Sequence, residues 1–468
     1  MYAPLQVLSS YSLLQSPLRI PEYVKLGKEL GYNALVLTDI NSMYGVLDFY
    51  HECVKAGIKP IIGITLQSGD DEYIFIAKNS NGYQNLMNIS SKRLTAVDEN
   101  YKNIFKLADI TEYLQDVIVI LKPSYLTVND IISDQVTELQ TLVSAAETTY
   151  YGVNPNDRDA INNDLMAAEK LQLETILLTP VKYLKERDYF STKVLQAIGT
   201  GENVNPNWNL KSDGNYLHTP EEYERLGADY LSSAYQNAIN MIAQCNLTLN
   251  FPKTQLPHFK ETNGLSSEDF LRKLCQEGLA KRIAEENIKN QEEYQSRLDY
   301  ELSVIHRMGF DDYFLIVWDV TNFAHENNIL TGPGRGSAAG SLVSYTLYIT
   351  DIDPIKYDLI FERFLNEERA QMPDIDLDIP DIKRDTIIEY LHQKYGQQHM
   401  AQIITFGTLK TKQVLRDVAR VFDLKTYEAD AWSKAIPKEY GITLKEAYAS
   451  SQSLKNLVAD NSKNRDRK

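Results

Sequence analysis

Residues 372–380, MPDIDLDIP, carry a carboxylate at every second position: Asp374, Asp376 and Asp378. Alternation with a period of two predicts a strand on which the aspartates share one face while the intervening Ile and Leu residues face a core. Neighbours on one face lie roughly 6.5–7 Å apart, so their oxygens could converge on a cation. An all-oxygen set favours Mg²⁺ or Mn²⁺ over zinc. A solvated edge strand explains the pattern equally well.

Residues 330–341, LTGPGRGSAAGS, form a second pattern that could do chemistry. Gly334 and Gly336 would let the backbone approach a phosphate closely, and Arg335, Ser337 and Ser341 would add donors near a helix N-terminus. The lysine of a P-loop is absent, and the match to a dinucleotide fingerprint is loose. A tight turn before a helix is at least as common. Together, however, the two segments supply both halves of metal-assisted nucleotidyl transfer.

Residues 408–425 form a basic segment with helical spacing. Lys412, Arg416 and Arg420 fall at i, i+4 and i+8, which predicts one cationic helix face, and Lys410 and Lys425 extend it. Five basic residues here oppose only two acidic ones. Such a face could contact a nucleic-acid backbone, although the charges alone fit an ordinary solvated helix better.

The first 200 residues alternate short β-branched runs with helical patterns, which predicts a parallel sheet covered by helices, open or closed into a barrel. The predicted strands are 35–38, 60–66, 73–77, 117–121 and 175–179; the predicted helices are 21–30, 47–56, 82–94 and 161–171. Residues 219–246 and 266–307 read as helical. Strand and helix mix from about residue 310, and helices return beyond residue 406.

Composition bounds the class of protein. The length of 468 residues suggests about three domains. Hydrophobic residues make up 43 % of the chain, which excludes a disordered or fibrous protein. The 48 basic and 64 acidic side chains give a net charge of −16. The acidity argues against nucleic-acid binding by the whole surface. Three distant cysteines, the lack of a long apolar run and the lack of a secretory signal favour a cytoplasmic protein.

Several ordered blocks resemble the bacterial replicative DNA polymerases of the C family, the DNA polymerase III alpha subunits. The blocks are residues 308–310, 313–317, 332–337, 361–366, 373–378, 383–385 and 402–408. The similarity runs from the N-terminus to at least Phe422. It implies a palm with a polymerase-beta-like nucleotidyltransferase fold, followed by the start of a helical thumb.

The resemblance also implies roles for single residues. Asp374 and Asp376 match metal-binding catalytic carboxylates that hold two Mg²⁺ ions (or Mn²⁺), and Asp378 is a candidate for a further ligand. The turn that binds the nucleotide would consist of Gly334, Arg335, Gly336, Ser337 and Ser341. The DNA backbone would be contacted by Lys410, Lys412, Arg416 and Arg420. The substrates would be dNTPs and primer-template DNA. A sliding clamp and other replisome subunits would bind through regions absent here.

The N-terminal segment resembles the polymerase-and-histidinol-phosphatase (PHP) domain of that family, a distorted α/β barrel with metal ligands at its strand ends. The histidine motif of the family maps onto residues 4–10, PLQVLSS, so its ligands are missing. Asp39 remains, but Thr65 and Lys182 stand at other ligand positions. We therefore expect no metal and no phosphatase activity in this domain, whose role would be structural packing against palm and thumb.

The expected domains are a degenerate PHP-type domain over 1–245, the first part of the palm over 246–405, a partial thumb over 406–460 and a disordered end over 461–468. The third catalytic carboxylate of the family lies after the thumb, so we expect a fragment that does not polymerise alone. The alternative is a non-catalytic scaffold that binds DNA or replisome subunits. A phosphoesterase activity of the N-terminal domain is a third interpretation.

Overall fold

The structure is a computed structural model that describes residues 2–68, 71–98, 102–122, 134–157, 159–204, 211–228, 231–251, 257–369, 372–397 and 399–465. Its contacts define two compact units. The first combines Met1–Asn250 with Gly407–Lys468, and the second is Phe251–Phe406. These divisions lie beside the expected domain boundaries at 245/246 and 405/406, but they group the C-terminal helices with the N-terminal domain.

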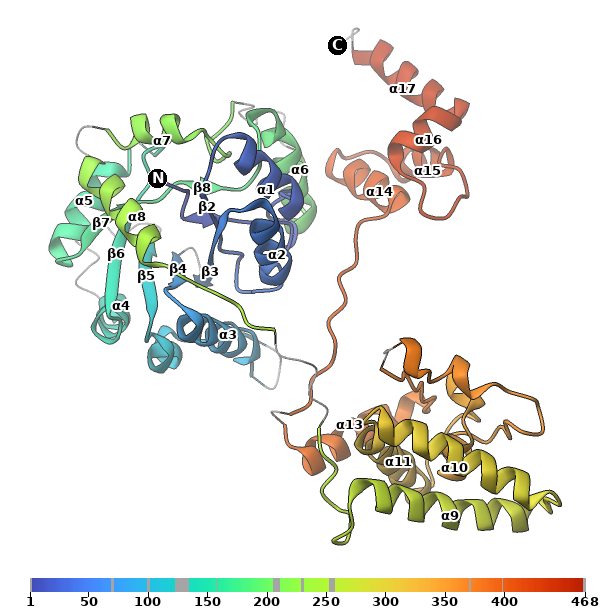
Figure 1. Cartoon of the computed structure of the whole chain (residues 1–468). Helices are drawn as coiled ribbons and strands as arrows, with labels where there is room; N and C mark the ends of the chain where they lie inside the picture. The colour runs from blue at the N-terminus through green and yellow to red at the C-terminus, as the bar shows by residue number, and fades with distance from the viewer. Residues whose placement is uncertain are drawn as a thin grey trace. The chain divides into compact units, whose positions relative to one another are not determined.

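In the described part of the first unit, eight strands form the centre (Figure 1). They are β1 (Gln6–Val7), β2 (Ala34–Leu37), β3 (Lys59–Ser68), β4 (Asp71–Ala77), β5 (Val117–Lys122), β6 (Thr148–Val153), β7 (Glu174–Leu177) and β8 (Pro180–Val181). The five predicted strands are confirmed within a few residues. β1, β6 and β8 were missed, two of them because a two-residue strand has no readable period.

The six-stranded sheet has the order β2-β3-β4-β5-β6-β7, and it is mixed rather than wholly parallel. β4 runs antiparallel to both β3 and β5. The expectation of a parallel sheet is wrong here because only two residues separate β3 from β4, too few for a crossover connection. The remaining pairs in the sheet are parallel.

The sheet curls toward a barrel through β1 and β8, which pair with each other in parallel. The backbone N–H of Thr38 donates to the carbonyl of Val7 at 2.9 Å, so β1 also joins the end of β2. β7 and β8 are separated by two residues only. The eight strands therefore nearly close a ring, as expected of a distorted α/β barrel.

Helices surround these strands and bury their apolar faces against them. They are α1 (Ile20–Glu29), α2 (Val46–Ala56), α3 (Ser80–Thr95), α4 (Asp134–Ala145), α5 (Ile161–Lys170), α6 (Tyr189–Thr200), α7 (Pro220–Leu226) and α8 (Ser232–Gln244). The four helices predicted among the first 200 residues are confirmed. One continuous core joins helices and sheet, and its strands are buried on both faces, which is why they read as unbroken apolar runs.

The second unit is helical in its described residues. It contains α9 (Ser267–Glu286), α10 (Gln291–Arg307), α11 (Asp311–Glu326), the short α12 (Leu342–Thr346) and α13 (Asp381–Tyr395). The expected mixture of strand and helix is not observed, since no strand is assigned in 257–369, 372–397 or 399–406. A 3₁₀ turn, Gly336–Gly340, precedes α12, and the core beneath it includes Leu298, Phe314 and Phe361.

Beyond residue 406 the described residues form α14 (Thr411–Val421), α15 (Thr426–Lys434), α16 (Leu444–Ser450) and α17 (Gln452–Arg465). Val421 is fully buried with Val194 and Ala197 of α6, so α14 belongs to the first unit. The expectation of disorder from residue 461 is wrong up to Arg465, because polar residues can continue a helix through backbone hydrogen bonds alone. Residues 466–468 lie outside the described part.

Among the described residues, no helix is both long enough and apolar enough to cross a membrane. All three cysteines are free thiols buried in the interior. Burial raises the pKa of the Cys53, Cys245 and Cys275 thiols to about 12 in each case, which makes them unreactive core residues.

Candidate functional site

The glycine-rich turn and the aspartate segment lie against each other in the second unit. The N–H of Gly332 donates to the carbonyl of Asp378 at 2.9 Å. A Cβ added at Gly332 would lie 2.7 Å from the Cβ of Asp378, and one at Gly336 would lie 3.7 Å from an oxygen of Asp376. The glycines therefore allow a backbone approach that larger residues would prevent at Gly332.

Arg335 connects the two segments electrostatically. Its guanidinium lies 3.3 Å from Asp376 Oδ1 and 3.6 Å from Asp378 Oδ1. All three side chains are about half exposed, so the ion pairs add little stability. Their importance is geometric, because a positive group already draws two of the three carboxylates toward the turn. In this structure Arg335 is the cation that the two carboxylates pair with, and their oxygens are ligands of the type that a hard cation takes.

The exposure pattern of the aspartate segment is the predicted one. Asp374, Asp376 and Asp378 are exposed, whereas Ile375 and Leu377 are half-buried against the core of the unit. The segment is not paired as a strand with any described residue, and its N-terminal part is held instead by Ile375 N–H, which donates to the Tyr313 hydroxyl at 3.2 Å. Burial raises the pKa of Tyr313, and the charges of Asp374 and Asp376 raise it further.

The three aspartates do not form a complete metal cage. Within the described ranges, no group of three or more His, Cys, Asp or Glu side chains lies close enough to hold one ion. The predicted convergence of all three carboxylates on a single cation is therefore not seen. Two carboxylates converge on Arg335, which is compatible with a metal site that takes further oxygen ligands from substrate or water, as Mg²⁺ sites commonly do.

The two serines of the turn differ in their surroundings. Ser337 is exposed beside Gly336, which has a φ of +67°. Ser341 is fully buried: its hydroxyl donates to Glu301 at 2.9 Å and accepts from Ser344 N–H at the start of α12. The prediction that Ser341 donates to a ligand is corrected, since its hydroxyl caps a helix in the core.

A buried arginine that the sequence analysis missed supports the first half of the turn. The guanidinium of Arg282 lies between the rings of Tyr345 and Tyr348, 4.1 and 3.9 Å from their centroids, and donates to the carbonyl of Thr350 at 3.0 Å. Thr350 in turn packs against Gly334, where an added Cβ would lie 2.7 Å from its methyl carbon. The signal was an arginine among buried apolar positions of α9.

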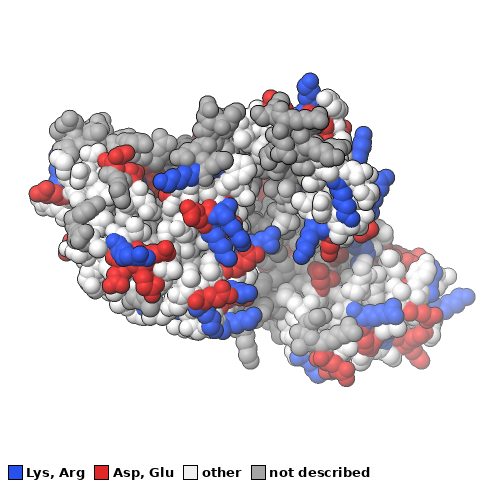
Figure 2. Space-filling view, turned by 90° about the horizontal axis from the view of Figure 1, so that it is seen from above, with Lys and Arg blue, Asp and Glu red and all other residues white. Residues whose placement is uncertain are grey.

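The predicted basic face on α14 is present but partly engaged. Arg416 lies 3.7 Å from an oxygen of Asp430, and Arg420 donates to the carbonyl of Ile198 at 3.2 Å. The ammonium of Lys410 lies 5.7 Å from the ring centroid of Tyr440. Lys412 forms no ion pair with a described residue. Figure 2 shows acidic and basic side chains interspersed over the face in view.

Asp39, the aspartate that remains at an expected ligand position of the first unit, is hydrogen-bonded by protein groups. Asp39 is buried, and its carboxylate accepts hydrogen bonds from Ser9 N–H (2.6 Å), Ser9 Oγ (2.7 Å) and Ser12 Oγ (2.6 Å). Burial raises the pKa of Asp39, although these hydrogen bonds oppose the shift. The hydroxyl of Thr65 donates to the carbonyl of Thr38, so it too is engaged in the core.

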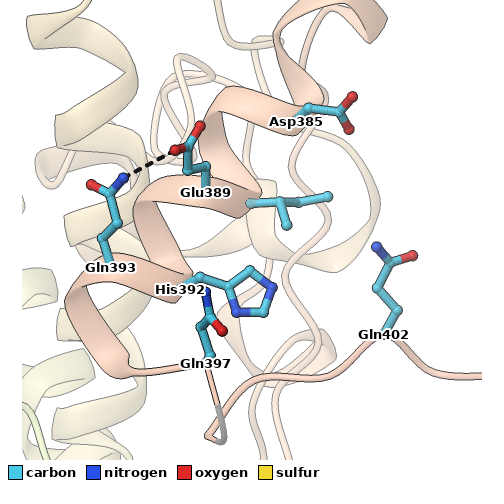
Figure 3. A pocket seen from close by; sticks show the side chains of 7 residues that line it. Asp385, Glu389, His392, Gln393, Gln397 and Gln402 are labelled. Atoms are coloured by element: carbon cyan, nitrogen blue, oxygen red, sulfur yellow. Dashed lines mark hydrogen bonds between the residues drawn. The ribbon is translucent and has the colours of Figure 1, made fainter. Parts of the chain in front are cut away.

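An open pocket of about 420 Å³ lies on one side of α13 (Figure 3). It is lined by Asp385, Ile388, Glu389, His392, Gln393, Gln397 and Gln402. The ring of His392 points into it, and its Nδ1 is buried without a hydrogen-bond partner among described residues. None of the predicted site residues lines this pocket, so it is separate from the turn and the aspartates.

Comparison with known families agrees with both units. Residues 4–153 match the family described as "PHP domain", and residues 269–467 match "Bacterial DNA polymerase III alpha NTPase domain". The first match covers β1–β6 and α1–α4, and it ends before β7 and β8. The second covers α9–α17 and includes the glycine turn, the aspartate segment and the basic helix.

Curated relatives cover nearly the whole chain. The chain is 39 % identical to the DNA polymerase III subunit alpha of Bacillus subtilis over 98 % of its length, and 38 % identical to that of Halalkalibacterium halodurans over 97 %. It spans about two fifths of the length of these relatives. The chain belongs to the DNA polymerase III alpha subunit family.

Solved structures with a similar fold include an amidohydrolase from Chromobacterium violaceum. The two proteins share 11 % sequence identity, and the alignment has a TM-score of 0.29. It covers 39 % of this chain and 88 % of the amidohydrolase. At this level the likeness adds nothing to the assignment.

Proposed function

We propose that this chain is part of a DNA-directed DNA polymerase that adds dNTPs to a primer 3′ end on a template. The observation that supports the proposal most directly is the contact between the glycine turn and the aspartate segment, bridged by Arg335. A triphosphate cradle and metal-binding carboxylates are the two parts that such a reaction requires, and the two segments proposed for these roles lie in contact.

In this proposal Asp374 and Asp376 hold Mg²⁺ or Mn²⁺, and Asp378 assists or pairs with Arg335. The bound ions would activate the attacking 3′ hydroxyl and stabilise the departing pyrophosphate. The N–H groups of the turn at Gly334, Gly336 and Ser337, with the Arg335 side chain, would bind the triphosphate. Arg335 would thereby exchange its carboxylate partners for phosphate oxygens, for which a guanidinium has a matching geometry.

The basic face of α14 would contact the DNA backbone, with Lys410 and Lys412 more available than Arg416 and Arg420, whose guanidiniums have partners. The first unit would be structural, since protein donors surround Asp39. A sliding clamp and other replisome subunits would bind parts of the polymerase beyond this chain. The protein would act in the cytoplasm, where chromosomal replication takes place.

The test uses the longest natural protein that carries this sequence. Asp376→Asn should abolish primer extension, because it removes one charge from the proposed metal site while conserving side-chain size. Asp381→Asn is the matched control, since Asp381 is an exposed aspartate at the start of α13 just beyond the segment. Normal extension by the Asp376 variant would refute the assignment. Primer-template binding without any extension by the wild type would favour the non-catalytic scaffold.

A further inference from the structure

One buried carboxylate of the second unit takes no part in the proposed chemistry. Glu301 is completely buried on α10, in a stripe that is otherwise formed by Tyr294, Leu298, Leu302 and Ile305. A buried carboxylate in an apolar stripe is costly unless hydrogen-bonded partners surround it. Glu301 has such partners, and two of them lie directly after the glycine turn.

The two oxygens of Glu301 face different groups. Oε2 accepts from Ser341 Oγ at 2.9 Å and from Val343 N–H at 3.1 Å, which are the first groups after the 3₁₀ turn Gly336–Gly340. Oε1 accepts from Arg297 Nε at 2.7 Å. Burial raises the pKa of Glu301, but the hydrogen bonds and Arg297 oppose that shift.

Arg297 extends the same network to the turn itself. Its Nη2 donates to the carbonyl of Gly340 at 3.2 Å and to the carbonyl of Leu359 at 3.3 Å. Gly340 also packs tightly on the next segment, because an added Cβ would lie 2.9 Å from the carbonyl oxygen of Ile360. The downstream end of the turn is therefore held by a side-chain network and by close backbone packing.

The exposed part of the turn lies between two anchored ends. Upstream, Asp351 N–H donates to the carbonyl of Pro333 at 2.9 Å, and the Arg282 network supports this return segment. Downstream, Glu301 and Arg297 hold Gly340 to Val343. Arg335, Gly336 and Ser337, which face solvent, span the gap. Groups held in this way are preorganised for a ligand, because little further ordering is needed on binding.

We propose that Glu301, acting with Arg297, is a positioning residue that fixes the glycine turn in the conformation that binds the triphosphate of the incoming nucleotide. This inference rests on the proposed polymerase function. It assigns Glu301 no contact with substrate and no part in the chemistry. Its effect is on how well the backbone N–H groups of the turn are placed.

The experiment compares Glu301→Gln with the wild type in the longest natural protein, using single-nucleotide incorporation over a range of dNTP concentrations. Glutamine keeps the size of the side chain but removes its charge and turns a donor toward Arg297. The KM for dNTP should rise about tenfold while kcat changes less than about twofold, because binding rather than the chemical step depends on turn position. Primer-template affinity should stay unchanged.

Two further variants separate positioning from stability. Arg297→Lys keeps the charge but loses the forked contacts, so its KM should rise by a smaller factor of about three. Asp312→Asn disrupts a different polar network of the same unit, away from the turn. It should lower the melting temperature without changing the KM. An unchanged KM in both the Glu301 and Arg297 variants, or an equal rise in Asp312→Asn, would overturn the inference.

The outcome is distinguishable from failure of the proposed function. If the wild type incorporates no nucleotide, or Asp376→Asn extends normally, the polymerase assignment fails regardless of Glu301. If the wild type is active and Asp376→Asn is not, the assignment stands and the KM values alone decide the role of Glu301. If Glu301→Gln does not fold, Arg297→Lys, whose side chain is partly exposed, carries the test.

Discussion

Asp39 of the first unit and Asp376 of the second have the same side chain in opposite surroundings. Asp39 is buried and receives three hydrogen bonds from Ser9 and Ser12. Asp376 is about half exposed, and among the described residues its ion-pair partner is Arg335. A carboxylate whose lone pairs are filled by protein donors contributes to the fold, whereas one that faces solvent beside a partly exposed cation has lone pairs left to accept an ion.

The contrast shows how one residue type can be engaged by the fold in one unit and left accessible in the other. In the first unit, serines around Asp39 supply donors where a metal cluster would need further ligands. In the second unit, the aspartates project from a segment whose apolar side chains are packed into the core, so the carboxylates cannot turn inward. Surroundings rather than residue type distinguish the two sites.

The largest expected effect on stability is at Asp39. Asp39→Ala should destabilise the first unit by about 3 kcal/mol, because it leaves one N–H and two hydroxyls buried without an acceptor. Asp376→Ala should change the stability of the second unit by less than about 0.5 kcal/mol, since the site is exposed. Hydrogen exchange of β2 and of α13 peptides reports on each unit separately. Equal effects at the two positions would contradict the inference that only Asp39 contributes strongly to stability.

A smaller effect is expected in cation binding. Mn²⁺ titration of this chain, followed by electron paramagnetic resonance, should show binding that Asp376→Asn weakens roughly tenfold, in line with the loss of one metal-site interaction. Asp39→Asn should leave the titration unchanged, because Asp39 is surrounded by protein donors. Weaker Mn²⁺ binding in the Asp39 variant would show that the first unit keeps a metal site.

The smallest expected effect is the pH dependence that Asp312 gives to the free energy of unfolding. Burial opposes its ionisation, but hydrogen bonds from Ser267, Phe259 N–H and His258 outweigh burial and lower its pKa below the usual 3.8. Its stabilisation is complete above the unfolded pKa and is lost as pH falls through the lower folded pKa. Wild type should therefore lose more free energy of unfolding than Asp312→Asn between pH 6 and pH 3.

At Asp39 the pH dependence of stability should have the opposite sign. Its pKa is raised, so the folded state holds the proton more tightly and the contribution of Asp39 declines as pH rises above about 3.8. Hydrogen exchange of the first unit in wild type and Asp39→Asn over the same pH range measures this difference. A wild type whose first unit gains stability relative to Asp39→Asn as pH rises from 3 to 6 would contradict the direction.

Much of the fold could be predicted from local pattern. The strands β2, β3, β4, β5 and β7 and the helices α1, α2, α3 and α5 follow from apolar periodicity and from the turn residues between them. The strands β1 and β8 could not be predicted, because two residues carry no period and their pairing joins positions about 170 residues apart. The antiparallel course of β4 depended on connection length, which the pattern of alternation does not contain.

The candidate site was predictable in residue type and only partly in geometry. The exposure of the aspartates follows from their alternation with Ile and Leu. The sequence could not predict that Ser341 is buried in the core or that Arg420 donates to a carbonyl of α6. Both depend on contacts between distant segments. Glu301 gave a signal, a charge within an apolar stripe, but no indication of what it holds.

The alternating aspartates, the glycine turn and the basic helix are local patterns, so residue type and spacing are enough to identify them as candidates for chemistry. Which of these groups are available depends on contacts between segments far apart in the chain. Burial and hydrogen-bond partners from elsewhere in the chain engage Asp39 and Ser341 in the core and leave Asp376 and Ser337 exposed. The physical reason is that a polar group is free to bind a ligand only where folding has not already satisfied it.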